Sequence, residues 1–168
     1  MEYNDFNGYT IERVTPLHYP LLAPLYADAF GSLISETEIA KRYNTAALGC
    51  EHIGFIALTK NPVTAAAYYG VFPVQLKKDQ EIILGAQSGD TMTHSQHRMK
   101  GLFVHLARLT YEECTRLNIR LIFGQPNKNS FQGLIKLNWL HPDTIVRYNL
   151  KLKFKTFMLK QKKLEINK

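Results

Sequence analysis

Cysteine is scarce in this sequence: Cys50 and Cys114 are the only two, and they form no Cys-x-x-Cys spacing. This pattern favours neither a zinc ribbon nor a disulfide-stapled scaffold, so a reduced, cytoplasmic protein is the expectation. Long apolar runs are missing too, because no stretch approaches the roughly 18 apolar residues of a membrane span. The polar and acidic start of the chain, Met1–Asp5, argues against a secretory signal.

Acidic residues are fewer than basic ones, and the net charge of +7 would suggest a nucleic-acid partner if it were spread over the chain. Residues 1–146 carry 13 Lys and Arg against 13 Asp and Glu, so the whole excess lies in residues 147–168. We therefore expect no nucleic-acid partner. Binding of RNA, a membrane or an acidic partner by the basic tail, residues 156–168, remains the alternative.

The start of the basic segment alternates between apolar and polar residues, which predicts a half-buried strand with lysines on its wet face. The apolar members are Tyr148, Leu150, Leu152 and Phe154. We expect a single domain over residues 1–155.

Three histidines lie close together in the sequence, His94, His97 and His105. A zinc site needs a complete set of ligands, and no carboxylate or cysteine completes this one at ligand spacing. We therefore expect no metal.

The segment from Thr91 to Phe103 leads from a predicted strand into a predicted helix through a basic turn that contains glycine. A helix start presents unpaired backbone N–H groups and the positive end of the helix dipole, so it is suited to bind an anion. Arg98 and Lys100 add charge beside these donors, and Gly101 has no Cβ to keep a phosphate at a distance. The turn is therefore a candidate pyrophosphate site.

Hydrophobic periodicity and capping signals predict the remaining elements. Predicted helices cover Tyr19–Phe30, Glu36–Tyr43, a long segment from Gly101, and Ser130–Leu137. Gly31 ends the first of these helices, and Ser35 begins the second as N-cap, with Glu38 completing a capping box. Predicted strands cover Tyr9–Val14, His52–Thr59, Ala65–Val74, Glu81–Gln87, Ile119–Gly124 and Thr144–Phe154, with an irregular stretch at Ser88–Thr93. This order indicates an α/β layered fold with a mixed sheet.

Two further patterns concern side chains on these elements. In the long helix, Arg108, Glu112 and Arg116 are spaced as an i,i+4 ladder on the face opposite the apolar stripe. On the predicted strand, Tyr68 and Tyr69 are expected to point to opposite sides, one inward and one outward. The outward ring would lie on the surface or line an acceptor cleft.

The run from Arg98 to Phe103 resembles the Arg/Gln-x-x-Gly-x-Gly/Ala loop of the GNAT superfamily of N-acetyltransferases. Arg98 and Gly101 match this pattern, whereas Phe103 stands where the family has a small residue. Downstream, Lys136–Trp139 is similar to the family's Lys-Leu-Gly-Phe, and Gln87–His94 is similar to one branch of it. The resemblance covers roughly residues 9 to 152 and implies the GNAT fold, a mixed, mostly antiparallel sheet flanked by helices.

The resemblance also implies a co-substrate, acetyl-coenzyme A. Its pyrophosphate would bind the turn, and its pantetheine arm would follow the backbone of the preceding strand. Asn127 matches a family asparagine near the coenzyme, with an Asx turn or a helix cap as the alternative. The residues so implied are Met92, Thr93, His94, Arg98, Met99, Lys100, Gly101, Leu102, Phe103 and Asn127.

Acetyl transfer to an amine also needs a base, for which Asp90 and His94 are the candidates. A turn-capping aspartate and a surface histidine are the alternatives, and Glu81 is a weaker third candidate. The tyrosine that many relatives use as the acid is replaced here by Leu134. Tyr148 could substitute for it, or the thiolate of coenzyme A could leave without a protein acid.

Taken with the resemblance, these residues predict an N-acetyltransferase that moves acetyl from acetyl-coenzyme A to a primary amine of a small molecule by direct attack in a ternary complex. An amino sugar is slightly favoured as the acceptor, and a homodimer is possible. Phe103 and Leu134 favour the alternative, a non-catalytic GNAT-fold module that binds coenzyme A or a protein partner.

Overall fold

The computed structural model of the protein describes residues 5–144 and contains one five-stranded sheet. Its strands are β1 (Thr10–Arg13), β2 (Ile53–Leu58), β3 (Ala65–Lys78), β4 (Glu81–Thr93) and β5 (Leu121–Phe123). They lie in sequence order across the sheet, and all neighbours are antiparallel except β4 and β5, which are parallel. The sheet is therefore mixed and mostly antiparallel, as predicted.

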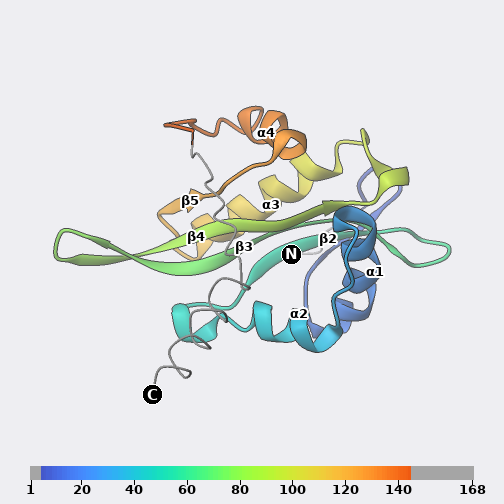
Figure 1. Cartoon of the computed structure of the whole chain (residues 1–168), viewed down its shortest axis with the longest axis horizontal. Coiled ribbons are helices and arrows are strands. Elements are labelled where there is room, and N and C mark those ends of the chain that lie inside the picture. Colours follow the sequence, from blue (N-terminus) through green and yellow to red (C-terminus); the bar gives the residue numbers. More distant parts are fainter. Residues whose placement is uncertain (1–4, 145–168) are drawn as a thin grey trace, which may run out of the picture.

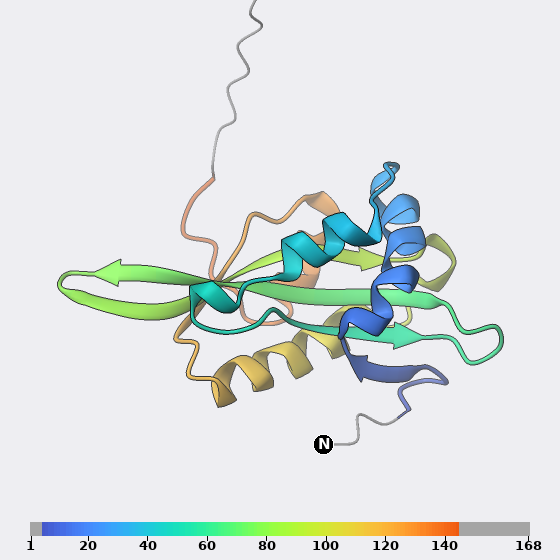
Figure 2. The ribbon, with the colours of Figure 1, turned by 90° about the horizontal axis from the view of Figure 1, so that it is seen from below.

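Helices cover both faces of the sheet. The helices α1 (Tyr19–Phe30) and α2 (Glu36–Tyr43) lie on one face, and α3 (Leu102–Arg116) and α4 (Lys128–Ile135) lie on the other (Figures 1 and 2). Single turns of 3-10 helix, η1 (Pro16–His18), η2 (Ala46–Leu48) and η3 (Ser95–His97), connect these elements. Within residues 5–144 no helix has the length and apolar character needed to cross a membrane.

The bounds of α1 and α2 are those predicted, because both helices carry strong local stop and start signals. Gly31 ends α1 in the left-handed conformation, with a φ of 68°. Ser35 begins α2, and its Oγ accepts a hydrogen bond from the Glu38 N–H at 3.2 Å. The Glu38 carboxylate in return accepts from the Ser35 N–H at 2.8 Å, which completes the capping box.

The predicted strand ended at Gln87, but β4 continues beyond it to Thr93, through the stretch expected to be irregular. The irregularity is a β-bulge: Tyr68 pairs with Met92 and Gly70 with Gly89, so that two residues of β4 lie opposite Tyr69. Asp90, one of these two, has a φ of 51°. The predicted strand at Thr144–Phe154 and the tail lie outside the described residues.

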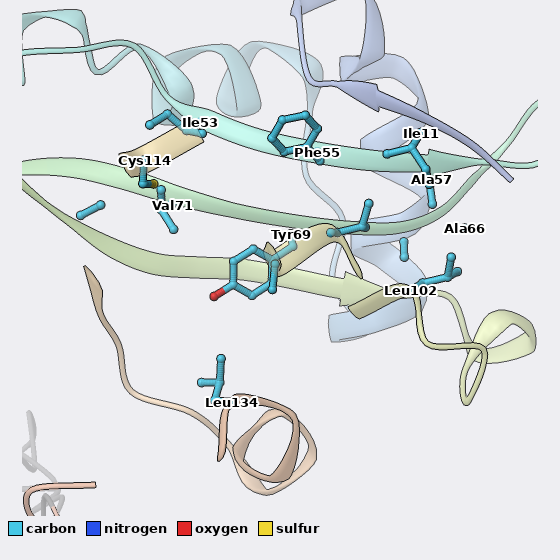
Figure 3. Close-up of a cluster of buried hydrophobic side chains, with 14 of the residues drawn as sticks. Ile11, Ile53, Phe55, Ala57, Ala66, Tyr69, Val71, Leu102, Cys114 and Leu134 are labelled. Atoms are coloured by element: carbon cyan, nitrogen blue, oxygen red, sulfur yellow. The ribbon is translucent and has the colours of Figure 1, made fainter. Parts of the chain in front are cut away.

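The expectation that Tyr68 or Tyr69 has an outward, surface ring is wrong, because both side chains are buried. They do point to opposite faces of the sheet, but helices cover each face. Tyr69 belongs to a core with Leu102 and Leu134 on the side of α3 and α4 (Figure 3). Tyr68 belongs to a second core, packed beneath α1 and α2.

An acidic residue fixes α3 to the first strand. Glu113 is buried and pairs with Arg13 at 3.0 Å and with Arg116 at 2.7 Å. Hydrogen bonds from Arg116 lower the pKa of Glu113, as does the nearby charge of Arg13. Arg116 thus reaches an i,i+3 partner, whereas the predicted ladder placed it with Glu112.

Candidate active site

The two parallel strands separate after a short stretch of pairing. Residues Gly85–Gln87 of β4 pair with Leu121–Phe123 of β5. Beyond this pairing β4 continues to Thr93, whereas the segment after β5 leads into α4. A cleft of about 790 Å³ opens at this point. Its walls are the end of β4, the turn before α3, the segment from Gly124 into α4, and part of α1.

The turn before α3 presents backbone donors to this cleft. Met99 and Gly101 both have positive φ values, 62° and 77°, and α3 begins at Leu102 directly after Gly101. Residues 97–104 all line the cleft. Because the first N–H groups of a helix have no partner within the helix, the turn has the chemistry of an anion site.

Side chains from two other elements hold this turn in place. Asp28 of α1 accepts hydrogen bonds from the Ser95 N–H at 2.7 Å and from the Ser95 hydroxyl at 2.8 Å. On the other side, the Tyr9 hydroxyl accepts from Lys100 Nζ at 2.9 Å and is hydrogen-bonded to His97 Nδ1 at 2.8 Å. The Lys100 ammonium is therefore already engaged, and the exposed Arg98 donates from its Nε to the Thr93 carbonyl oxygen at 3.5 Å.

Among the three residues predicted to carry the pantetheine arm, Thr93 lines the cleft. The His94 N–H donates to the Ala66 carbonyl of β3 at 2.9 Å. Since antiparallel pairing alternates along a strand, the N–H and C=O of Thr93 point to the opposite edge, where the cleft opens. Met92 does not line the cleft, because its side chain is in the core beneath α1 and α2.

Phe103 lines the cleft without filling it, because α4 has a glycine beside it. A Cβ built on Gly133 would lie 2.5 Å from the Phe103 ring, so the missing side chain of one residue accommodates the ring of the other. The ring also packs edge-on against Tyr69, with centroids 5.5 Å apart. Leu134, at the position of the usual acid, is buried against the same cleft.

Asn127 lies at the rim of the cleft and caps α4. Its Oδ1 accepts hydrogen bonds from the N–H groups of Asn129 at 2.9 Å and Ser130 at 3.0 Å. The side-chain oxygen is therefore used within the protein, as the helix-cap alternative predicted.

Asp90 lines the cleft from the β-bulge and forms an ion pair across to α2. Arg42 Nη1 lies 2.8 Å from both oxygens of the Asp90 carboxylate. The Asp90 side chain is 18% exposed and that of Arg42 is 42% exposed, so both partners are partly accessible to solvent. Sequence reasoning could not identify Arg42 as the partner, because the two residues are 48 positions apart.

The histidines of the turn differ in their access to the cleft. His94 does not line it: Nδ1 accepts from the Gln96 N–H at 3.3 Å, and Nε2 lies 3.7 Å from an Asp28 oxygen. His97 does line it, and partial burial together with the charge of Lys100 lowers its pKa. His97 is thus a further possible base, which the sequence suggested only as a metal ligand.

The remaining candidates lie elsewhere. Glu81 is at the far end of the β3–β4 hairpin, where it pairs with Arg120 at 3.3 Å, and it does not line the cleft. Across residues 5–144, the His, Cys, Asp and Glu side chains form no group of three or more that could hold a metal.

The mixed sheet opens where its parallel pair ends, and a glycine turn leads into a helix that lines this opening. The chain is similar to solved structures of known acetyltransferases. A glucosamine-6-phosphate N-acetyltransferase from Arabidopsis thaliana matches with a TM-score of 0.69 at 13% identity, over 85% of this chain and 99% of that chain. An acetyltransferase from Trypanosoma brucei matches with a TM-score of 0.68 at 12% identity, over 84% and 99%.

An aminoglycoside acetyltransferase from an uncultured soil metagenomic sample, solved with sisomicin, matches with a TM-score of 0.61 at 17% identity, over 88% of this chain and 98% of that chain. No protein-family model and no curated protein matches the sequence. The chain therefore has the fold of the GNAT acetyltransferases, and at these identities the likeness concerns the fold.

Proposed function

We propose that the protein is an acetyl-coenzyme A dependent N-acetyltransferase that acetylates a primary amine of a small molecule. The observation that carries this proposal is the cleft beyond the paired stretch of β4 and β5, which is lined by both the glycine turn and an ion-paired carboxylate, Asp90. An acyl transfer of this kind needs a grip on the coenzyme, a polarised thioester and a proton acceptor.

The residues of the cleft fit the coenzyme. The N–H groups that begin α3, with Arg98 beside them, would bind the pyrophosphate. The Thr93 N–H, which points away from β3, would donate to the pantetheine arm, and the Thr93 carbonyl oxygen, which accepts from Arg98 Nε at 3.5 Å, has a second lone pair for an amide of the arm. Asn127 lies at the rim, where its cap fixes the start of α4.

In the proposed reaction, the amine nitrogen attacks the thioester carbonyl carbon and the carbon–sulfur bond breaks. The proton lost by the amine passes to a base, for which Asp90 and His94 remain the candidates, with His97 added by its place in the cleft. Leu134 cannot donate a proton to the departing thiolate. A thiol with a pKa of about 8.5 is a good enough leaving group to depart as the anion.

A non-catalytic coenzyme-binding module is the second candidate. Two observations favour it: Leu134 replaces a proton donor, and both oxygens of Asp90 already accept from Arg42. Among the enzymatic alternatives an amino sugar is the preferred acceptor, because one structural neighbour acetylates glucosamine 6-phosphate according to its name.

Calorimetric titration with acetyl-coenzyme A and with free coenzyme A tests the proposal, followed by a screen of primary amines for acetyl transfer. Binding with turnover supports the enzyme. Binding without turnover on any amine supports the module, and a folded protein that binds neither form of the coenzyme contradicts both.

A further inference from the structure

A second hollow adjoins the cleft. It has a volume of about 520 Å³ and lies between the end of α1 and α2. Its lining residues are Tyr26, Ser32, Leu33, Ile34, Glu38, Lys41 and Arg42. Tyr26 lines both the hollow and the cleft, so the two spaces share this residue as a wall.

The Arg42–Asp90 ion pair stands at this junction. Arg42 lines the hollow and Asp90 lines the cleft, and the guanidinium also lies over the Tyr26 ring, 5.8 Å from its centroid. Both partners are partly exposed, and they come from separate elements, α2 and the bulge of β4. A solvent-accessible pair contributes little to stability, so a ligand with both charges can replace each partner with one of its own.

The charges of the hollow favour an anion. Its one carboxylate, Glu38, is engaged by the Ser35 N–H and hydroxyl at 2.8 and 2.7 Å in the cap of α2. Against this one carboxylate, whose charge Lys41 and Arg42 also face, the lining carries these two cations, and Arg42 becomes available when an ammonium takes its place beside Asp90. A negatively charged group entering here would meet two positive side chains, while an ammonium on the same molecule would face Asp90.

We propose that the acceptor is a small primary amine that also carries an anionic group, a phosphate or a carboxylate, and that Arg42 and Lys41 bind this group while Asp90 receives the amine. The proposal rests on the acetyltransferase function proposed above. On binding, the anion of the incoming molecule pairs with the Arg42 guanidinium and its ammonium pairs with the Asp90 carboxylate. Two ion pairs with the ligand thus replace the one between Arg42 and Asp90. The exchange places the amine in the cleft beside the coenzyme.

Matched amines that differ in the anionic group provide the test. Acetyl transfer is measured with 2-aminoethyl phosphate, β-alanine and ethanolamine, and with glucosamine 6-phosphate and glucosamine. We expect kcat/KM to be at least about tenfold higher for an acidic amine than for its neutral counterpart, the size of a charge-assisted contact. The phosphate and carboxylate arms of the panel show which anion is preferred.

Arg42→Gln should bring the acidic-to-neutral ratio of kcat/KM close to one, and Arg42→Lys should retain part of the preference. Arg120→Gln is the matched control, because Arg120 is an exposed, ion-paired arginine at the other end of β4, and it should leave the ratio unchanged. Thermal unfolding checks that each variant is folded. Titration of the coenzyme-saturated protein with the same amines gives an independent reading from binding.

If the protein binds acetyl-coenzyme A but neither binds nor acetylates any acidic amine in preference to its neutral partner, the inference is wrong and the coenzyme site stands. An acidic preference that survives Arg42→Gln unchanged also overturns it. Failure to bind acetyl-coenzyme A at all instead removes the proposed function, and this inference with it.

Discussion

On one side of the cleft, residues 97–104 offer a ligand backbone N–H groups at the start of α3. Elsewhere in the wall of the cleft, the bulge of β4 offers the carboxylate of Asp90, which pairs with Arg42 of α2, a residue that lines the neighbouring hollow. Backbone donors are common to any sequence that forms the turn, whereas side-chain charges differ from chain to chain. The first side is therefore suited to a constant co-substrate and the second to a particular acceptor.

The largest effect should separate these two roles. Asp90→Asn or His94→Ala is expected to lower turnover by about 10²-fold or more, since a positioned base contributes 10²–10⁴-fold, while coenzyme affinity changes little. Steady-state kinetics on an accepted amine, paired with calorimetric titration of coenzyme A, measure both quantities.

His97→Gln belongs in the same series, because His97 lines the cleft and His94 does not. If all three variants keep wild-type rates, none of the three side chains is the base, and the proton must pass to water.

The next effect concerns the packing of Tyr68 against Gly70 in the core beneath α1 and α2. The Tyr68 ring lies over Gly70, and a Cβ built on Gly70 would be 2.0 Å from the Tyr68 hydroxyl oxygen. Because Tyr68 is buried, Gly70→Ala should lower the free energy of unfolding by about 3 kcal/mol, the upper range for overpacking. Urea unfolding measures the change.

Tyr68→Phe, which removes the nearest atom, should recover part of this loss when combined with Gly70→Ala. Gly31→Ala is the matched control, because its added Cβ would meet no atom within 4 Å and only its positive φ opposes the change. Equal losses at Gly31 and Gly70 would show that the Tyr68 contact is not the cause.

The contrast between the two sides also explains how much the sequence could predict. Local signals decided α1, α2 and the turn at Gly101, because Gly31, the Ser35–Glu38 box and a glycine after basic residues act within a few positions. The Arg42 partner of Asp90 was not predictable, since it depends on how α2 packs across the sheet. The burial of both Tyr68 and Tyr69 had the same origin, helices on both faces.

Two details of the coenzyme side escaped sequence reasoning as well. The bulge at Asp90 shifts the register of β4, which places Met92 in the core and the backbone of Thr93 at the cleft. Position in the sequence alone gave Met92, Thr93 and His94 equal weight. The place of His97 in the cleft depends on the path of the turn held by Tyr9.

On the coenzyme side, Arg98→Ala should weaken coenzyme A binding by roughly 1.5–3 kcal/mol, or about 10- to 150-fold, because a charge-assisted phosphate contact is lost. Arg108→Ala on the exposed face of α3 changes the net charge equally and should leave affinity unaltered. Calorimetry at two salt concentrations separates contact from long-range attraction. Equal losses in both variants would remove Arg98 from the site.

The smallest effect tests the aromatic cluster of His52, Tyr43 and Tyr68 by the response of protein stability to pH. His52 is buried, its Nε2 is 2.6 Å from the Tyr68 hydroxyl, and its ring stacks on Tyr43 at 4.0 Å. Burial, with a contribution from the charge of Arg13, lowers the pKa of His52 to about 3. The unfolded chain has a histidine pKa of about 6.5, so it takes up a proton that the folded protein excludes.

The contribution of His52 to stability is therefore complete above pH 6.5 and is lost as the pH falls toward 3. One titrating group changes the free energy of unfolding by about 1.4 kcal/mol per pH unit, or about 2 kcal/mol between pH 6.5 and 5. His52→Phe keeps a ring in the stack and removes the titration, so urea unfolding of this variant should lose about 2 kcal/mol less than wild type between pH 7.5 and 5. Equal losses would mean that the folded protein lets His52 become charged, and the cluster of His52, Tyr43 and Tyr68 would then be open to water.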